Sequence, residues 1–241
     1  MKTSVTRRSR RASVAWKTFF ASTLLWASAE SAGQSENNKY PVREDIAPYV
    51  LPLKVPVFTY TDGRKQHRIE FCSGTLLATE PPAILTAWHC FDGLQDLTKP
   101  AQGFISDEWI SLKLIASGDS MKADWALLVP SDNSDLSLPT GLSISASRPS
   151  VFSVAGYSRE QTGESKGLSV GHDCAVIGKF EGFLTTSCDA AEGASGGPAL
   201  GWVDGELRIF GIISARNEAG TLLLTPVSTE IYPPGVLPSP P

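Results

Sequence analysis

The segment GASGGP, residues 193–198, places one serine hydroxyl, that of Ser195, among three glycines. Gly193 leaves backbone N–H groups free to converge with that of Ser195, while Gly196 and Gly197 let the chain turn closely behind the serine without Cβ clashes. These features suit a nucleophile loop with an oxyanion hole. Taken alone, however, a serine in a glycine-rich loop more often belongs to an ordinary turn. Other groups must decide between the two interpretations.

Two further segments carry the groups that a serine nucleophile requires. Attack by a hydroxyl needs a base to take its proton and a group to orient that base. The segment ILTAWHC ends an apolar run with His89 beside Cys90, so that a strand end would fix the imidazole. The segment KADWALL places Asp124 at the mouth of another apolar run, where a buried carboxylate without a partner would be costly. A histidine N–H would supply that partner.

The elements that position these residues are predicted to be strands. From about residue 50 onward, short runs rich in valine, isoleucine, leucine, phenylalanine and threonine alternate with glycine, proline, asparagine and aspartate. This spacing predicts an all-β barrel or sandwich. The pair Asp204-Gly205 suits the positive φ angles of a type I′ hairpin turn. Residues 130–150, rich in serine, proline and aspartate, are expected to form the crossing between two β units.

Residues 1–29 have the organisation of a secretory signal peptide. Six lysine and arginine residues precede the uncharged run TFFASTLLWASA, which ends in the small-x-small pattern Ala27-Ser28-Ala29. This run falls well short of the roughly twenty apolar residues that a membrane-spanning helix needs, so we expect cleavage and no stable membrane insertion afterwards. Export predicts a secreted or periplasmic protein. Residues 30–47 are polar and are expected to be a loose leader or a pro-segment.

The charge balance argues against a nucleic-acid partner. Removal of the signal peptide takes away six of the 21 basic residues and none of the 25 acidic ones, so the formal net charge changes from −4 to −10. Binding to phosphates needs concentrated positive charge, which such a chain lacks.

The four cysteines, Cys72, Cys90, Cys174 and Cys188, form an even set in a chain that is expected to be exported. This argues for two disulfides. A zinc site is the competing interpretation, but no pair has C-x-x-C spacing and the chain has three histidines. No metal site and no cofactor are therefore predicted.

The segments CSGTLLATEPPAILTAWHC, DWALL and GASGGPAL together resemble the chymotrypsin and trypsin superfamily of serine endopeptidases, in its chain order of histidine, aspartate and serine. The resemblance spans roughly residues 48–230 and is closest in pattern to bacterial extracellular relatives. It implies an all-β fold of two six-stranded antiparallel β-barrels, with the active site in the cleft between them. The first barrel is expected over residues 48–135 and the second over residues 136–232. Residues 233–241 form a proline-rich tail, expected to be frayed; a ligand for another domain is the alternative.

The resemblance also implies roles for individual residues. Ser195 would be the nucleophile, His89 the general base and then acid, and Asp124 the residue that holds the histidine tautomer. The backbone N–H groups of Gly193 and Ser195 would form the oxyanion hole.

Substrate binding is implied for residues on both sides of the nucleophile. Ser214, Ala215 and Arg216 align with the strand that pairs with the substrate backbone. Asp189 falls where trypsin-like enzymes bind arginine or lysine, although we favour the interpretation that it is a structural feature of the bacterial branch. Arg216 replaces a glycine and could block or neutralise the pocket. Ile213 stands where the glutamyl endopeptidases tend to have a histidine, so glutamate specificity is not supported.

The disulfide pairing is likewise implied by the resemblance. Cys72 with Cys90 matches the family's bridge beside the histidine, and Cys174 with Cys188 would clamp the nucleophile loop. Ala194 replaces the aspartate with which the animal enzymes bind a newly cut N-terminus, so that activation switch is absent.

These features predict a secreted, monomeric serine endopeptidase that hydrolyses protein or peptide substrates through a His-Asp-Ser triad and an acyl-enzyme intermediate. A catalytically silent homologue acting as a binding module is the alternative, but such proteins usually lose a triad member and this chain keeps all three. An esterase-type hydrolase is disfavoured because the G-x-S-x-G elbow and the order serine, aspartate, histidine are absent.

Overall fold

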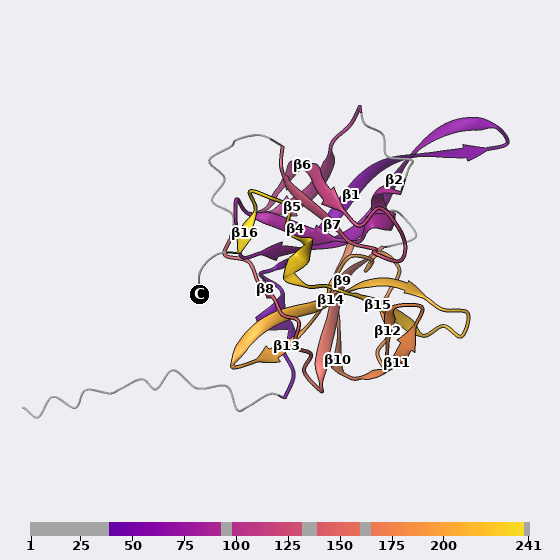
Figure 1. Ribbon diagram of the computed structural model, residues 1–241. Helices are drawn as coiled ribbons and strands as arrows, with labels where there is room; N and C mark the ends of the chain where they lie inside the picture. The colour runs from indigo at the N-terminus through magenta and orange to yellow at the C-terminus, as the bar shows by residue number, and fades with distance from the viewer. Residues whose placement is uncertain (1–38, 93–97, 132–138, 160–164, 239–241) are drawn as a thin grey trace, which may run out of the picture. The chain divides into compact units, whose positions relative to one another are not determined.

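The structure of the chain is a computed structural model, shown in Figure 1, that describes residues 39–92, 98–131, 139–159 and 165–238. The expected signal peptide lies outside the described residues, as does the expected barrel boundary at residues 135 and 136. No helix among the described residues has the length and apolar content needed to cross a membrane.

The first half of the fold is a closed six-stranded barrel with the hydrogen-bonded order β1-β2-β4-β7-β6-β5. Its strands are β1 (Val50–Thr61), β2 (Arg64–Leu77), β4 (Ala83–Thr86), β5 (Ala101–Ile105), β6 (Glu108–Ser117) and β7 (Ala126–Pro130). Aliphatic side chains such as Leu53, Ile84 and Leu128 are fully buried inside it. Their removal from water is the main stabilising contribution, and closure leaves the barrel without an unpaired edge.

The second half is an eight-stranded sheet with the order β10-β9-β13-β14-β15-β12-β11, and β8 pairs with β14. Its strands are β8 (Ser143–Ile144), β9 (Phe152–Arg159), β10 (Ser165–Cys174), β11 (Val176–Phe180), β12 (Phe183–Thr186), β13 (Pro198–Val203), β14 (Glu206–Arg216) and β15 (Leu222–Pro226). Only Ala175 separates β10 from β11, so one bent segment supplies both ends of the sheet. If β10 and β11 are counted as one strand, the second half is a barrel of six strands. The expected two-barrel fold is confirmed, and β8, from the crossing segment, is an additional strand.

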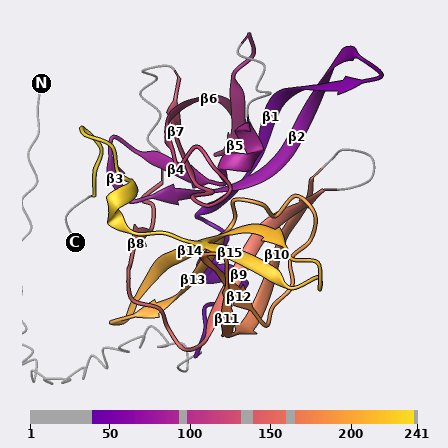
Figure 2. The same ribbon diagram turned by 45° about the vertical axis from the view of Figure 1, so that its right-hand side comes forward.

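The two barrels lie against each other, one above the other in Figure 1 and in the turned view of Figure 2. Phe152 and Phe210 pack edge to face in the second barrel, with their ring centroids 4.9 Å apart. Leu200, Ile209 and Ile212 of the second sheet belong to the same apolar cluster as the core of the first barrel. This shared core fixes the two barrels relative to each other, which a site between them requires.

Tight turns with left-handed backbone connect several strands. Asp204 (φ 53°) and Gly205 (φ 81°) join β13 to β14, as the sequence predicts. Asp62 (φ 52°) and Gly63 (φ 73°) join β1 to β2 in the same way. The sequence has the same Asp-Gly signal at both turns, so the second hairpin was equally predictable.

Both ends of the described chain differ from the loose segments that the sequence predicts. Ile46, within the expected leader, is fully buried, and the carbonyl of Pro41 accepts a hydrogen bond of 2.7 Å from the buried Ser153 hydroxyl. At the other end, Leu237 of the proline-rich tail pairs with Glu80. Proline lacks an N–H group but is tolerated in such edge pairing. The expected leader and tail therefore contribute to the folded unit through residues 39–47 and 233–238.

Short elements complete the fold: α1 (Arg43–Ile46), β3 (Thr79–Glu80), η1 (Trp88–Phe91), η2 (Thr229–Ile231) and β16 (Leu237–Pro238).

Candidate active site

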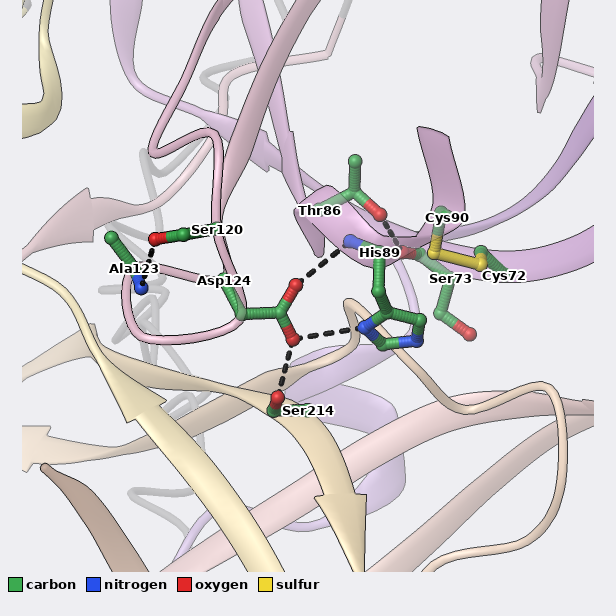
Figure 3. Close-up of polar contacts among 9 residues, drawn as sticks. All are labelled: Cys72, Ser73, Thr86, His89, Cys90, Ser120, Ala123, Asp124 and Ser214. Carbon is green, nitrogen blue, oxygen red and sulfur yellow. Dashed lines mark hydrogen bonds and ion pairs between the residues drawn. A yellow bond between two sulfur atoms is a disulfide. The ribbon is translucent and has the colours of Figure 1, made fainter. Parts of the chain in front are cut away.

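His89 lies in η1, the single helical turn that follows β4. The apolar residues of β4 are fully buried, and the chain leaves the barrel wall directly after Thr86. A disulfide between Cys90 and Cys72 ties this turn to β2, as Figure 3 shows. The backbone of His89 is thus fixed on both sides, by β4 and by the disulfide. The His89 side chain is 24 % exposed.

Asp124 is delivered by the compact loop between β6 and β7. The N–H of Gly118 donates a hydrogen bond of 2.9 Å to the carbonyl of Trp125, and the N–H of Ala123 donates one of 3.1 Å to the carbonyl of Ser120. These bonds close the loop upon itself. The Asp124 side chain, which is fully buried, points from it toward His89 (Figure 3).

His89 and Asp124 are joined by two hydrogen bonds. The Nδ1 atom of His89 lies 2.9 Å from Oδ2 of Asp124, and the backbone N–H of His89 donates to Oδ1 over 2.8 Å. An ionised carboxylate can only accept hydrogen bonds, so Nδ1 carries a proton, and in the neutral imidazole Nε2 keeps its lone pair. In Figure 3 the second ring nitrogen faces away from Asp124. This tautomer leaves the imidazole able to accept a proton at Nε2.

The hydroxyl of Ser214 donates a third hydrogen bond to Asp124, at Oδ2. The pairing of β14 with β15 shifts register between Ile213 and Ala215, so that Ser214 lies at a β-bulge. A bulge re-aims a side chain, which here carries the hydroxyl from the second barrel to a carboxylate of the first.

These three donors keep the Asp124 carboxylate ionised. Burial alone would raise the pKa of the carboxyl group. The hydrogen bond and the charge of His89, the Ser214 hydroxyl and the backbone N–H of His89 outweigh burial, and the pKa lies below its ordinary value of 3.8. A negative charge held beside the imidazole stabilises its protonated form.

The loop before Ser195 is fixed by hydrogen bonds to its carbonyl groups. The carbonyl of Glu192 accepts a bond of 2.8 Å from the N–H of Arg159, and that of Ala194 accepts one of 2.9 Å from the N–H of Gly197. In a trans peptide the N–H points opposite to the carbonyl. The N–H groups of Gly193 and Ser195 belong to these two peptide units, so their directions are set before any ligand binds.

Ser73 of β2 holds the other two carbonyl groups of the loop. Its hydroxyl donates to the carbonyl of Gly193 over 3.0 Å, and its N–H donates to the carbonyl of Ser195 over 2.7 Å. Ser73 is fully buried. The first barrel therefore positions the loop on which the second barrel carries the candidate nucleophile.

A cavity of about 300 Å³ lies between the barrels at this site. Six of the residues predicted to act in catalysis or substrate binding line it: His89, Gly193, Ser195, Ser214, Ala215 and Arg216. Asp124 lies behind His89 and is shielded from solvent. The arrangement places the Ser195 hydroxyl, the His89 imidazole and the N–H groups of Gly193 and Ser195 around one cavity. These are the groups that attack on a carbonyl carbon requires.

A family model described as a trypsin-like peptidase domain matches residues 72–212, more than half of the sequence. The chain belongs to the trypsin-like peptidase family. The matched segment begins at Cys72 and includes His89, Asp124 and Ser195. No curated protein matches the sequence.

Solved structures with the same fold include three bacterial or extremophile proteases. The protease Anisep from Arthrobacter nicotinovorans is 14 % identical, with a TM-score of 0.55 over 74 % of this chain and 90 % of that one. The thermostable serine protease AL20 from an extremophilic microorganism is 14 % identical, with a TM-score of 0.55 over 74 % of this chain and 91 % of that one. The active form of the Rv3671c protease from M. tuberculosis is 15 % identical, with a TM-score of 0.50 over 75 % and 76 % of the two chains. At such identities the likeness concerns the fold alone.

Asp189 of this trypsin-like peptidase does not line the cavity that Ser195 lines. Its side chain is 78 % exposed and forms an ion pair with Arg216, which does line the cavity. It also accepts a hydrogen bond of 2.8 Å from the N–H of Ala190. The structure thus joins the two residues whose roles in specificity the sequence leaves open.

The second disulfide joins Cys174, at the end of β10, to Cys188, seven residues before the candidate nucleophile. Both bridges have the pairing that the resemblance implies. Within the described ranges, no group of three or more histidine, cysteine, aspartate or glutamate side chains gathers in a way that could hold a metal ion.

Two roles were missed by reasoning from the sequence. Ser73 stands within a motif that the sequence shares with the family, yet its contacts with the nucleophile loop have no local signal. Ser214 was assigned to substrate binding alone, and the hydrogen bond from its hydroxyl to Asp124 is a further role. The available clue is the same in both cases: a lone serine in an apolar strand needs a hydrogen-bond partner if it is buried.

Proposed function

We propose that this trypsin-like peptidase is a secreted serine endopeptidase, with Ser195 as nucleophile, His89 as general base and acid, and Asp124 as the residue that orients the histidine. The observation that carries the proposal is the pair of hydrogen bonds between His89 and the buried Asp124, beside a cavity that Ser195 also lines. We also propose that it acts as a monomer.

In the acylation step, the Ser195 hydroxyl attacks the carbonyl carbon of the scissile peptide bond and its proton passes to Nε2 of His89. The resulting oxyanion receives hydrogen bonds from the N–H groups of Gly193 and Ser195. The C–N bond then breaks, and His89 returns the proton to the departing amine. The acyl group stays on Ser195 as an ester.

In the deacylation step, His89 takes a proton from water, which attacks the ester carbon. The tetrahedral species then releases the carboxylic acid product, and the proton returns to the Ser195 oxygen. Asp124 stabilises the imidazolium in both steps and is not itself protonated. No cofactor takes part in this sequence.

Secretion is supported by two disulfides and by the signal-like residues 1–29. Disulfides persist in oxidising compartments outside the cytosol. Substrates would accordingly be proteins or peptides met in the periplasm or outside the cell.

Cleavage of a mixture of unfolded proteins, followed by mass spectrometry of the fragments, tests the proposal. The wild-type protein is expected to produce internal cuts, while Ser195→Ala and His89→Ala are each expected to lower the rate by about a thousandfold or more. Ser131→Ala removes an exposed hydroxyl outside the cavity that Ser195 lines and serves as the control. A wild-type protein that binds unfolded chains without cutting them would instead indicate a silent homologue.

A further inference from the structure

Arg216 reaches from the end of β14 to the segment that precedes Ser195. Its guanidinium donates to the carbonyl of Ala190 and pairs with the carboxylate of Asp189. It also donates to the carbonyl of Gly220 over 3.0 Å. One side chain therefore ties together three segments, and most of its hydrogen-bonding capacity is used within the protein.

The enclosed space beside Asp189 is small and separate from the cavity that Ser195 lines. Asp189 lines a separate cavity of about 10 Å³, next to Ala190, Ala194 and Ile213. Such a volume holds one water molecule at most. The Asp189 carboxylate is exposed but already paired with Arg216, whose guanidinium would repel a lysine or arginine side chain of a substrate.

Next to Arg216, the lining of the cavity beside Ser195 includes four apolar residues. Ala190, Ala191, Ala215 and Leu222 line it there and offer no charged partner to a ligand. Arg216, which is 42 % exposed, crosses between the segments that carry these residues. The other charged side chains on the lining are Glu70, Arg159 and Glu192. They carry both signs of charge, and the Glu192 carboxylate lies 3.9 Å from the Arg159 guanidinium.

We propose that the Asp189–Arg216 ion pair makes the cavity beside Ser195 unfavourable for cations, so that the enzyme cleaves after uncharged residues such as alanine and valine and rejects lysine and arginine. This inference rests on the proposed function, since it concerns the residue on the acyl side of the scissile bond. Asp189 then affects specificity through Arg216: it holds the guanidinium in place and, because it is already paired, does not bind a substrate cation.

The test uses N-succinyl-Ala-Ala-Pro-X para-nitroanilides in which X is alanine, valine, phenylalanine, glutamate, lysine or arginine. The wild-type enzyme is expected to have a kcat/KM for alanine or valine about tenfold or more above that for lysine and arginine. Arg216→Ala removes a positive charge from the cavity and leaves the Asp189 carboxylate unpaired, so kcat/KM for lysine and arginine is expected to rise about tenfold or more. Asp189→Ala combined with Arg216→Ala is expected to lose that gain.

Arg208→Ala is the matched control, because Arg208 also lies on β14 and also pairs with a carboxylate, that of Glu206, but does not line the cavity. Its substrate profile is expected to equal that of the wild type. Should Arg216→Ala fail to fold, Arg216→Gln and the wild-type profile still decide the matter.

A wild-type preference for lysine, arginine or glutamate overturns the inference, as does an Arg216→Ala variant that labels fully with a fluorophosphonate but gains no activity on cationic substrates. A wild-type protein that cleaves none of the substrates and does not label overturns the proposed function together with this inference.

Discussion

The backbone N–H of Ser73, in the first barrel, donates a hydrogen bond of 2.7 Å to the carbonyl of Ser195, in the second. The Ser73 hydroxyl extends the same connection, because it donates to the Gly193 carbonyl over 3.0 Å and accepts from the N–H of Tyr157 over 2.8 Å. One buried residue therefore joins β2, β9 and the nucleophile loop. The N–H groups of Gly193 and Ser195, the proposed oxyanion donors, lie in the loop that this connection holds.

Ser73→Ala is expected to lower kcat about tenfold with KM changed less than about twofold, since the Gly193 carbonyl loses its donor and the loop loses its orientation. Thr86→Val removes a comparable buried hydroxyl, which donates to the Ser73 carbonyl and lies next to Gly196 but does not hold the Gly193 carbonyl. Both variants are expected to lose about 1–3 kcal/mol of unfolding free energy. Steady-state kinetics and urea unfolding separate the two effects. Equal kcat values in the two variants would mean that Ser73 is merely structural.

Stability is expected to depend on pH through Asp124. Its pKa in the folded protein lies below 3.8, so the unfolded state binds more protons in the range between the two values. The stabilisation is therefore complete above about pH 5 and is lost as the pH falls below 3.8 and through the folded-state pKa. Asp124→Asn removes this contribution. Urea unfolding between about pH 2 and pH 6 should give a shallower dependence for the variant; parallel curves for the two proteins would contradict the assignment.

Gly196 is expected to tolerate no side chain. Its φ is +82°, and a Cβ atom there would lie 2.4 Å from the carbonyl oxygen of Ser73 and 2.7 Å from the nitrogen of Ala87. Gly196→Ala should cost roughly 3 kcal/mol or more. Gly205 has a similar φ of +81° with no heavy atom within 4 Å of the added Cβ, so Gly205→Ala should cost only about 1–2 kcal/mol. Thermal unfolding of the two variants measures the difference in unfolding free energy. Equal losses would mean that the positive φ causes the whole effect and that the close contacts at Gly196 contribute nothing.

The two disulfides should contribute similarly to stability but differently to activity. They close segments of 18 and 14 residues, and each is worth about 3 kcal/mol in the chain-entropy model. Cys72 adjoins Ser73 and Cys90 adjoins His89, so removing that bridge by double alanine substitution should also lower kcat about tenfold or more. Removing the bridge between Cys174 and Cys188 should lower kcat less than about threefold. Kinetics below the unfolding temperature of both variants test this order.

The groups proposed for the chemistry were the part of the site most accessible from the sequence. Each lies within a short contiguous motif, and the order His89, Asp124, Ser195 links three motifs that are each weak alone. The alternating apolar runs likewise predicted the all-β fold, because strand formation depends on local pattern. The Asp204-Gly205 turn was predictable for the same reason.

Other features depend on tertiary packing that no local pattern encodes. The contact between Asp189 and Arg216 joins residues far apart in the chain, and only the packing of β14 against the nucleophile loop brings them together. The burial of Ile46 in a polar segment has the same cause, since its neighbours are supplied by the barrels. The proline-rich tail gave no sign of its partner β3, because edge pairing places few demands on sequence.

The central claim is that Ser195 is a nucleophile activated by His89, and a fluorophosphonate probe followed by mass spectrometry of the digested protein tests it most directly. We expect one adduct per chain, located on Ser195, in the wild type and in Ser131→Ala, with slow labelling in His89→Ala and none in Ser195→Ala. Equal labelling of wild type and Ser195→Ala, or no labelling of the wild type, would contradict the claim.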